Sequence, residues 1–275
     1  QIVEPKERKA CSFERIYFSR GSDEKIYKER KALGYNLSER VLDAINHDLK
    51  NTIFSFIPNT AETAFLGMQK GMEAYLNKIK VERILSWGKD YDAEKLKEMV
   101  NRRIRIEKIA IKDVKMRTFI TEDTGRNEMV QHFYDITYGT VRPGEDTLVV
   151  IDDSIVRGTT LKESIIRMLG RLKPKRIVVV SSSPQIRYPD CYGIDMSKMG
   201  DFIAFNAAVE LMKERGKENC LKELLEKCKD LHRNNQLHTE NVVKQLYKQF
   251  TTEEISAKIA KLITPAGLDI PVDVI

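Results

Sequence analysis

The sequence contains no apolar run that approaches the roughly 18 residues needed to cross a bilayer. Residues 1–5 show no secretory signal, and the chain starts at Gln1 and not at Met. This start suggests a fragment, a processed chain or a trimmed chain. We therefore expect no membrane partner for this protein.

Cysteine is also scarce, with four residues: Cys11, Cys191, Cys220 and Cys228. No two of them form a C-x-x-C pair, and their spacing matches no zinc motif. Cys220 and Cys228 are eight positions apart in a stretch rich in Lys and Glu that reads as helix, which indicates reduced thiols. A reducing, cytoplasmic location is the expectation that fits best.

Charge of one sign does not dominate. The chain has 47 Lys and Arg against 41 Asp and Glu, and the net charge of +6 is spread along the sequence. Such a surface suits either general solvation or attraction to phosphorylated small molecules. No RNA- or DNA-binding motif accompanies it, so no nucleic-acid partner is expected. With 275 residues and 41% apolar content, the chain can form one large domain or two small ones.

Hydrophobic periodicity predicts an α/β protein. Helices are predicted at 26–48, 61–79, 92–103 and 159–172, and over most of 201–263. Strands are predicted at 13–18, 52–57, 104–111, 147–151 and 176–180. Residues 121–146 have little periodicity and are predicted to form a loop. The strand, loop, helix and strand over 147–180 form a βαβ unit, and its continuous apolar strands indicate a parallel sheet covered on both faces.

The loop after the strand at 147–151 carries the most informative residues. Ligands of open parallel sheets bind beyond the carboxyl ends of the strands, where Asp152 and Asp153 stand. Two adjacent carboxylates could hold Mg²⁺ or the hydroxyls of a sugar. Gly158 allows close backbone approach, and Thr159 and Thr160 open a helix whose N-terminus suits a phosphate. The loop thus offers ligands for hydroxyl groups or a metal first and a phosphate site second, which matches the two ends of a ribose 5-phosphate. A generic βα turn remains the alternative. The chain has no Walker motif and no G-x-G-x-x-G after a strand.

Residues 149–160, with the sequence VVIDDSIVRGTT, resemble the phosphoribosyl-diphosphate (PRPP) motif of type I phosphoribosyltransferases. The form DDSIVRGTT resembles in particular that of the glutamine PRPP amidotransferases, or amidophosphoribosyltransferases. Segments 11–20, 117–120, 183–189 and 192–196 resemble the same family in the same order. The resemblance implies a type I phosphoribosyltransferase fold: a central, mostly parallel sheet flanked by helices, a flexible active-site loop and a helical C-terminal part.

The resemblance also implies a domain organisation. Residues 1–20 would lead in from a missing N-terminal domain, and residues 21–200 would form the phosphoribosyltransferase domain with a helical insertion near 75–103. Residues 201–275 would be a helical C-terminal part packed on the same domain. In the family, the N-terminal domain releases ammonia from glutamine. Without that glutaminase domain, this chain is expected to use free ammonia.

The family transfers the phosphoribosyl group of PRPP to ammonia and forms phosphoribosylamine in de novo purine synthesis. The resemblance assigns PRPP binding to Asp152, Asp153, Ser154, Ile155, Val156, Arg157, Gly158, Thr159 and Thr160. It assigns pyrophosphate binding to Asn59 and Thr60, and Mg²⁺ binding to Asp152, Asp153 and Thr60. Arg117 and Lys112 are the expected catalytic residues, because positive charge there would stabilise the leaving group. Arg187 is expected either to contact a nucleotide or to form a structural salt bridge. A purine nucleotide regulator and a homo-oligomer are also expected.

Two segments depart from the family pattern. Residues 58–61 read Pro-Asn-Thr-Ala, without the acid and the final hydroxyl that the family has there. Acidic Glu122, Asp123 and Glu128 replace basic residues of the family's loop. A diverged paralogue that binds PRPP or a nucleotide with little catalysis is therefore one alternative, and a salvage phosphoribosyltransferase is a second. Some family members hold an iron–sulfur cluster through four cysteines; only Cys11 matches here, so we expect no cluster.

Overall fold

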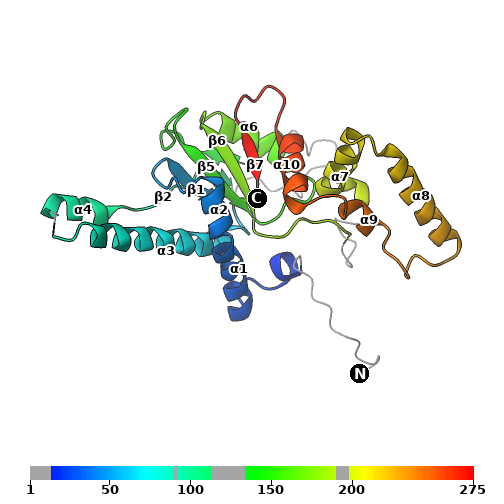
Figure 1. The fold of residues 1–275 in the computed structure, drawn as a ribbon, viewed down its shortest axis with the longest axis horizontal. Helices are drawn as coiled ribbons and strands as arrows, with labels where there is room; N and C mark the ends of the chain where they lie inside the picture. The colour runs from blue at the N-terminus through cyan, green and yellow to red at the C-terminus, as the bar shows by residue number, and fades with distance from the viewer. Residues whose placement is uncertain (1–13, 90–91, 113–133, 190–197) are drawn as a thin grey trace.

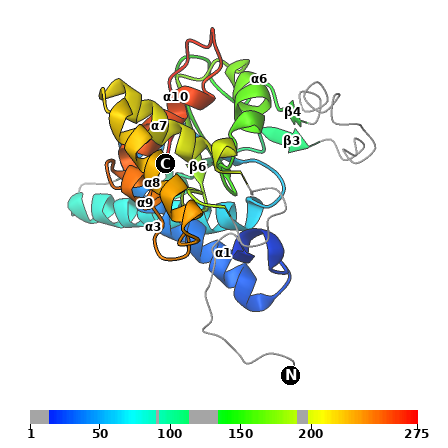
Figure 2. The same cartoon turned by 90° about the vertical axis from the view of Figure 1, so that its right-hand side faces the viewer.

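Five parallel strands form the central sheet, in the order β2-β1-β5-β6-β7 (Figure 1). The computed structural model describes residues 14–89, 92–112, 134–189 and 198–275. The strands of the sheet are β1 (Thr52–Phe56), β2 (Arg105–Ile106), β5 (Thr147–Asp152), β6 (Arg176–Ser181) and β7 (Val272–Val274). A separate antiparallel pair consists of β3 (Ala110–Lys112) and β4 (Tyr134–Ile136), which lies beside α6 (Figure 2).

The strand register brings three loops to one edge of the sheet. Phe56 of β1 lies opposite Ile151 of β5, and Asp152 of β5 lies opposite Ser181 of β6. Because all these strands are parallel, the segments that follow β1, β5 and β6 start side by side. This edge is where an open α/β sheet binds its ligands.

The apolar strands are buried on both faces. Leu148 and Val150 pack into one hydrophobic cluster, whereas Val149 and Ile151 pack into the other. Alternate residues of a strand point to opposite faces, so a continuous apolar run needs helices on both sides. The first cluster contains residues of η4 (Leu161–Ile165), α6 (Ile166–Gly170), α7 (Ile203–Glu214), α9 (Val243–Tyr247) and α10 (Thr252–Ile263). The second contains residues of α2 (Ser38–Ala44) and α3 (Glu62–Ser86).

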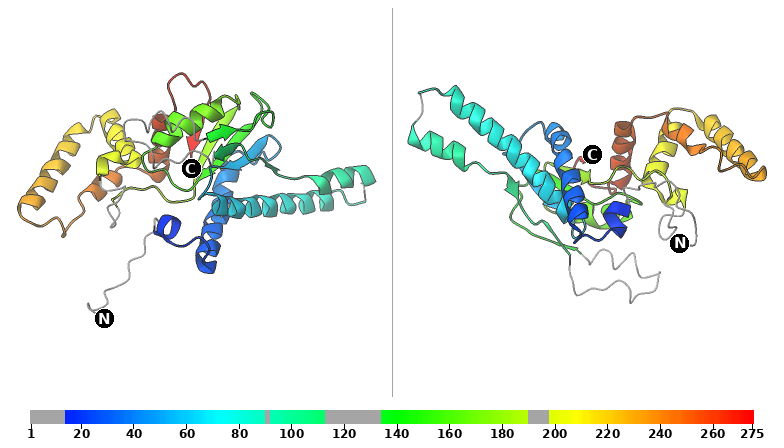
Figure 3. Two further views of the ribbon diagram at one scale, coloured as in Figure 1. Left: turned by 180° about the vertical axis from the view of Figure 1, so that it is seen from behind. Right: turned by 90° about the horizontal axis from the view of Figure 1, so that it is seen from below.

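Two helical segments extend away from the sheet on opposite sides (Figures 1 and 3). On one side, the buried residues of α3 end at Leu76, and its remaining turns run beside α4 (Ala93–Asn101). This is the region near 75–103 in which the resemblance implies a helical insertion. On the other side, α8 (Glu218–Arg233) has no fully buried residue. Within the described ranges, no helix combines the length and the apolar character required to span a bilayer.

The predicted α/β class, with a parallel sheet flanked by helices, is confirmed. The helices predicted at 26–48, 61–79, 92–103 and 159–172 are present with shifted ends, and the first is divided into α1 (Glu24–Asn36) and α2. The strand predicted at 104–111 is interrupted and forms β2 and β3 in different sheets. The loop predicted at 121–146 falls partly outside the described residues, and its described part contains β4.

The prediction of a strand at 13–18 is wrong. Residues 14–18 form a helical turn, η1 (Glu14–Phe18). The side chain of Arg30 on α1 donates to the carbonyl oxygens of Arg15 at 3.1 Å and Ser19 at 3.0 Å, and also to that of Ile16. These bonds satisfy backbone carbonyl groups of the turn that have no partner within it. The alternation of apolar residues along 13–18 gives no indication of such long-range bonds.

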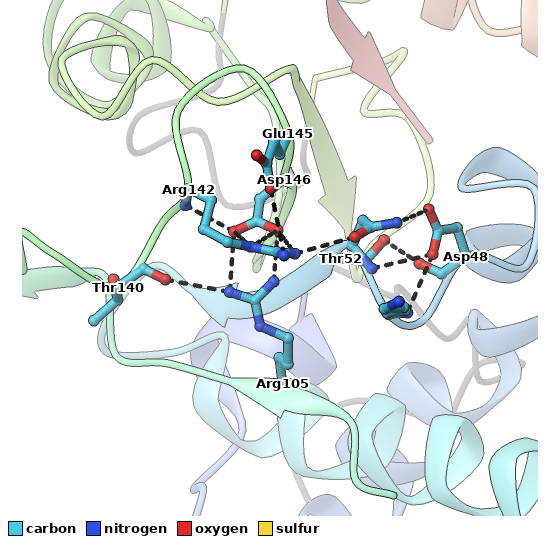
Figure 4. Close-up of polar contacts among 9 residues, drawn as sticks. Asp48, Thr52, Arg105, Thr140, Arg142, Glu145 and Asp146 are labelled. Carbon is cyan, nitrogen blue, oxygen red and sulfur yellow. Dashed lines mark hydrogen bonds and ion pairs between the residues drawn. The ribbon is translucent and has the colours of Figure 1, made fainter.

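A buried carboxylate fixes the opposite edge of the sheet, where β5 begins. The side chain of Asp146 is inaccessible to solvent and accepts hydrogen bonds from two arginines (Figure 4). Arg105 Nη2 donates to Oδ2 at 2.9 Å, and the backbone N–H of Arg142 donates to the same oxygen at 2.8 Å. Burial alone would raise the pKa of Asp146, but the hydrogen bonds from Arg105 and Arg142 outweigh it and lower the pKa to about 2.

We expect Asp146→Asn to lower the free energy of unfolding by about 2 kcal/mol at neutral pH, because two guanidinium groups lose their shared charged acceptor. The lowered pKa adds a pH signature. A carboxyl group with a depressed folded-state pKa stabilises the fold above its unfolded pKa, and this stabilisation disappears as the pH falls towards about 2. In urea denaturation between pH 5 and pH 2, the free energies of unfolding of the natural protein and of Asp146→Asn should become equal as the pH approaches 2. A constant difference over that range would contradict the assignment.

Candidate functional site

The loop between β5 and the next helix has the backbone expected of a phosphate cradle. β5 ends at Asp152, and helix starts at Thr159 and continues through η4 and α6. Gly158 has φ +72°, in the left-handed region that favours glycine. The exposed Thr159 and Thr160 lie in the first helical turn, whose N–H groups have no acceptor within the helix. An anion at this position would meet those N–H groups and the positive end of the helix dipole.

The two carboxylates at the start of the loop accept hydrogen bonds from its own backbone, and the segment after β6 binds the backbone of the same residues. The N–H of Asp153 donates to Asp152 Oδ1 at 2.8 Å, and the N–H of Ser154 donates to Asp153 Oδ1 at 2.7 Å. The N–H of Ser182 donates to the carbonyl oxygen of Asp152 at 2.9 Å. Burial raises the pKa of Asp152, and the neighbouring charge of Asp153 raises it further. A cation or a pair of hydroxyl donors would stabilise these like charges.

Tyr17, in the turn η1, reaches the carboxylates from a distant part of the sequence. Its hydroxyl donates to Asp153 Oδ1 at 2.7 Å and also makes a hydrogen bond with Ser154 Oγ. Burial and the negative charge of Asp153 raise the pKa of Tyr17, so its hydroxyl remains a donor at neutral pH. Arg30, which holds the turn, thereby fixes the direction from which Tyr17 approaches the loop.

The small sheet formed by β3 and β4 also lies near this loop. Burial raises the pKa of Tyr134 to about 12, and the charges of Asp152 and Asp153 contribute to that shift. Lys112 is the register partner of Tyr134 in the antiparallel pair. The side chain of Lys112 is exposed, and it lies opposite Tyr134, whose pKa is raised in part by the charges of both carboxylates.

The segment that is expected to bind pyrophosphate follows the neighbouring strand. The backbone N–H of Ile57 donates to the carbonyl oxygen of Ile151 at 2.9 Å, so the end of β1 lies directly beside the end of β5. Asn59, which is exposed, and Thr60, which is half-buried, come next along the chain. Both therefore lie at the same edge of the sheet as the carboxylates. Arg117, the other expected catalytic residue, lies outside the described residues.

Arg187 lies in a network of neutral partners. Its guanidinium donates to Gln185 Oε1 at 2.8 Å through Nη2 and at 3.1 Å through Nε, and to Thr252 Oγ1 at 3.3 Å. The guanidinium carbon lies 5.2 Å from the ring centroid of Tyr247, whose hydroxyl donates to the carbonyl oxygen of Arg187. These contacts join the segment after β6 to helices α9 and α10. They give Arg187 a packing role, and its nucleotide contact remains a prediction.

The sequence predicts a binding loop at 152–160 but gives no indication of Tyr17, Arg30 and Tyr134. Local patterns contain no signal that these side chains lie near the carboxylates, because each comes from a different part of the chain. Among the described residues, no group of three or more His, Cys, Asp or Glu side chains is arranged to hold a metal ion. The fold and the loop therefore define an α/β protein whose candidate site suits a phosphorylated sugar.

No protein-family model matches the chain. It is 28% identical to the amidophosphoribosyltransferase of Pseudomonas aeruginosa over 205 residues, which are 73% of this chain and 34% of that protein. It is 27% identical to the amidophosphoribosyltransferase of Lachancea kluyveri over 231 residues, which are 82% of this chain and 39% of that protein. Among solved structures, the PRPP amidotransferase from B. subtilis in complex with ADP and GMP has a TM-score of 0.49 and 27% identity, covering 74% of this chain and 38% of that one.

The resemblance to amidophosphoribosyltransferases is thus confirmed over most of this chain. The chain spans only about a third to two fifths of the length of these two relatives. The similarity therefore concerns a part of those proteins of about the size of one domain.

Proposed function

We propose that this chain binds PRPP at residues 152–160 and transfers the phosphoribosyl group to ammonia, forming phosphoribosylamine in de novo purine synthesis. The carrying observation is the pairing, within one βα loop, of the adjacent carboxylates Asp152 and Asp153 with the helix start at Thr159 and Thr160. The carboxylates suit the ribose hydroxyls, and the helix start suits the 5-phosphate. In this reaction, the bond from the anomeric carbon to pyrophosphate breaks and a carbon–nitrogen bond forms.

We further propose a metal site at the same edge of the sheet. Carboxylate and hydroxyl oxygens are the ligands that Mg²⁺ prefers, and Mg²⁺ commonly takes one or two carboxylates with the remaining ligands from phosphates and water. Asp152, Asp153 and Thr60 would hold it. When bound, the ion neutralises charge on the leaving diphosphate. Lys112 and Arg117 would add positive charge to the same group.

Other features of the proposal come from the resemblance. On this basis we also propose a division of the chain at residues 20 and 200, a cytoplasmic location and a homo-oligomeric assembly. The B. subtilis neighbour was solved with ADP and GMP. A purine nucleotide that regulates the present protein is the corresponding proposal.

A second function, PRPP binding without efficient turnover, is favoured by the pyrophosphate segment. Asn59 stands where the family has an acid, so the position carries no negative charge. Ala61 is 1% exposed and has no hydroxyl to offer. Fewer groups would then fix the leaving pyrophosphate, which lowers the rate more than it lowers the affinity for the ribose and 5-phosphate.

We expect the purified chain to bind PRPP in the presence of Mg²⁺ and to release pyrophosphate only when ammonia is added. Calorimetry measures the binding, and a coupled pyrophosphate assay measures the turnover. Binding without turnover would exclude the transferase and support the second function. Pyrophosphate release that depends on a nucleobase would instead indicate a salvage enzyme, and the absence of PRPP binding would contradict both leading proposals.

A further inference from the structure

One turn of the C-terminal part touches three consecutive residues of the phosphate loop. The N–H of Ile203, the first residue of α7, donates to the carbonyl oxygen of Val156 at 2.9 Å. Arg157 forms an ion pair with Asp201 at 3.5 Å. The side chain of Ile203 lies against Gly158. The turn that begins α7 therefore contacts the loop at Val156, Arg157 and Gly158.

The contact at Gly158 leaves no space for a side chain. A Cβ atom built on Gly158 would lie 2.4 Å from Ile203 Cδ1 and 2.9 Å from Ile263 Cγ2. Real Cβ contacts almost never fall below 3.0 Å. Ile203 is 6% exposed, and Ile263, the last residue of α10, is fully buried. Two isoleucines from separate helices thus fill the position behind the loop that a side chain would occupy.

We infer that Ile203 and Ile263 are positioning residues that set the conformation of the phosphate loop, so that the packing of α7 and α10 determines the affinity for PRPP. The inference rests on the proposed function of this loop. Neither side chain needs to touch the ligand. A glycine with positive φ has several accessible conformations, and the two isoleucines favour one by filling the space behind it.

The hydrogen bond from Ile203 contributes more to this support than the ion pair of Arg157. Arg157 and Asp201 have side chains that are 51% and 42% exposed, and ion pairs between exposed side chains stabilise little. By contrast, the bond from Ile203 to Val156 joins backbone to backbone, next to the buried Phe202. Backbone N–H groups that bind a phosphate must be held to within about 0.5 Å, which requires support of this kind.

Ile263→Ala tests the inference against a matched variant, Ile255→Ala. Both isoleucines are fully buried in α10 and belong to the same hydrophobic cluster, but of the two only Ile263 supplies one of the three atoms nearest to a Cβ built on Gly158. Both variants should lose similar stability in urea denaturation, because each leaves a cavity of the same side-chain volume. We expect the Kd for Mg²⁺-PRPP to rise about tenfold in Ile263→Ala and to change less than twofold in Ile255→Ala.

Steady-state kinetics gives a readout that loss of stability alone would not change. The KM for PRPP should rise in Ile263→Ala while the KM for ammonia stays the same. A second test combines Gly158→Ala with Ile203→Val, which removes the Cδ1 atom nearest to the added methyl group. We expect Gly158→Ala to weaken binding less in the Ile203→Val background than in the natural protein, by about fivefold.

The outcomes separate the inference from the proposed function. If the unmodified protein binds no PRPP, the proposed function is overturned, and the inference falls with it. If the unmodified protein binds PRPP but Ile263→Ala binds as tightly as Ile255→Ala, only the inference is overturned. Additive effects of Gly158→Ala and Ile203→Val would equally overturn it.

Discussion

The double variant Asp152→Asn/Asp153→Asn is expected to bind Mg²⁺-PRPP at least about a hundredfold more weakly than the natural protein. The amide groups keep the volume of the carboxylates but carry no negative charge and offer one acceptor oxygen in place of two. Both the ribose hydroxyls and the metal would lose their charged acceptors. Hydrogen bonds to charged groups contribute about 1.5–3 kcal/mol each, so two such losses are enough for this effect.

The same substitutions should leave the fold intact. Burial and the charge of Asp153 raise the pKa of Asp152, so ionisation of Asp152 costs stability in the folded protein. Removing the like charges relieves that cost, and the urea midpoint should stay unchanged or rise. Asp43→Asn serves as the control, because this acid lies on α2 with a side chain that is 68% exposed. An unchanged PRPP affinity in the double variant would refute the site.

Gly67→Ala is expected to destabilise the protein by about 3 kcal/mol or more, because α1 and α3 cross with their backbones in contact. A Cβ atom on Gly67 would lie 1.8 Å from the carbonyl oxygen of Lys31 in α1. The contact is reciprocal, since a Cβ atom on Gly34 of α1 would lie 1.7 Å from the carbonyl oxygen of Ala64 in α3. A backbone atom cannot move aside as a side chain can, so the two helices would have to separate.

Denaturation in urea measures this effect directly. Gly200→Ala is the matched control, because no atom lies within 4 Å of a Cβ built there and its φ is not in the left-handed region. That control should change the free energy of unfolding by less than about 0.5 kcal/mol. Separation of α1 from α3 would also displace Arg30 and the turn that carries Tyr17. An unchanged urea midpoint for Gly67→Ala would show that the helices can accommodate a methyl group at the crossing.

The sequence by itself determined the parts of this protein that depend on local chemistry. Two apolar runs, 147–151 and 176–180, are too short for helices. They are also too uniformly apolar for strands with one solvent-exposed face, so they predict a parallel sheet covered on both sides. The order of Asp152, Asp153, Gly158 and Thr159 along one loop predicts a ligand with hydroxyl groups at one end and a phosphate at the other. Such predictions depend only on residues that are close together in the sequence.

Only the tertiary structure decided which distant side chains lie at the candidate site and which helices pack behind its loop. Residues 14–18 form a helical turn because Arg30 binds its carbonyl oxygens, and β7 becomes a strand because β6 offers it an edge. Tyr17 reaches Asp153 across 136 positions of sequence. The periodicity of the sequence does not reveal such contacts, because each depends on how elements from distant parts of the chain pack together. The loop at 152–160 is thus readable from its own residues, whereas its support by Ile203 and Ile263 is not.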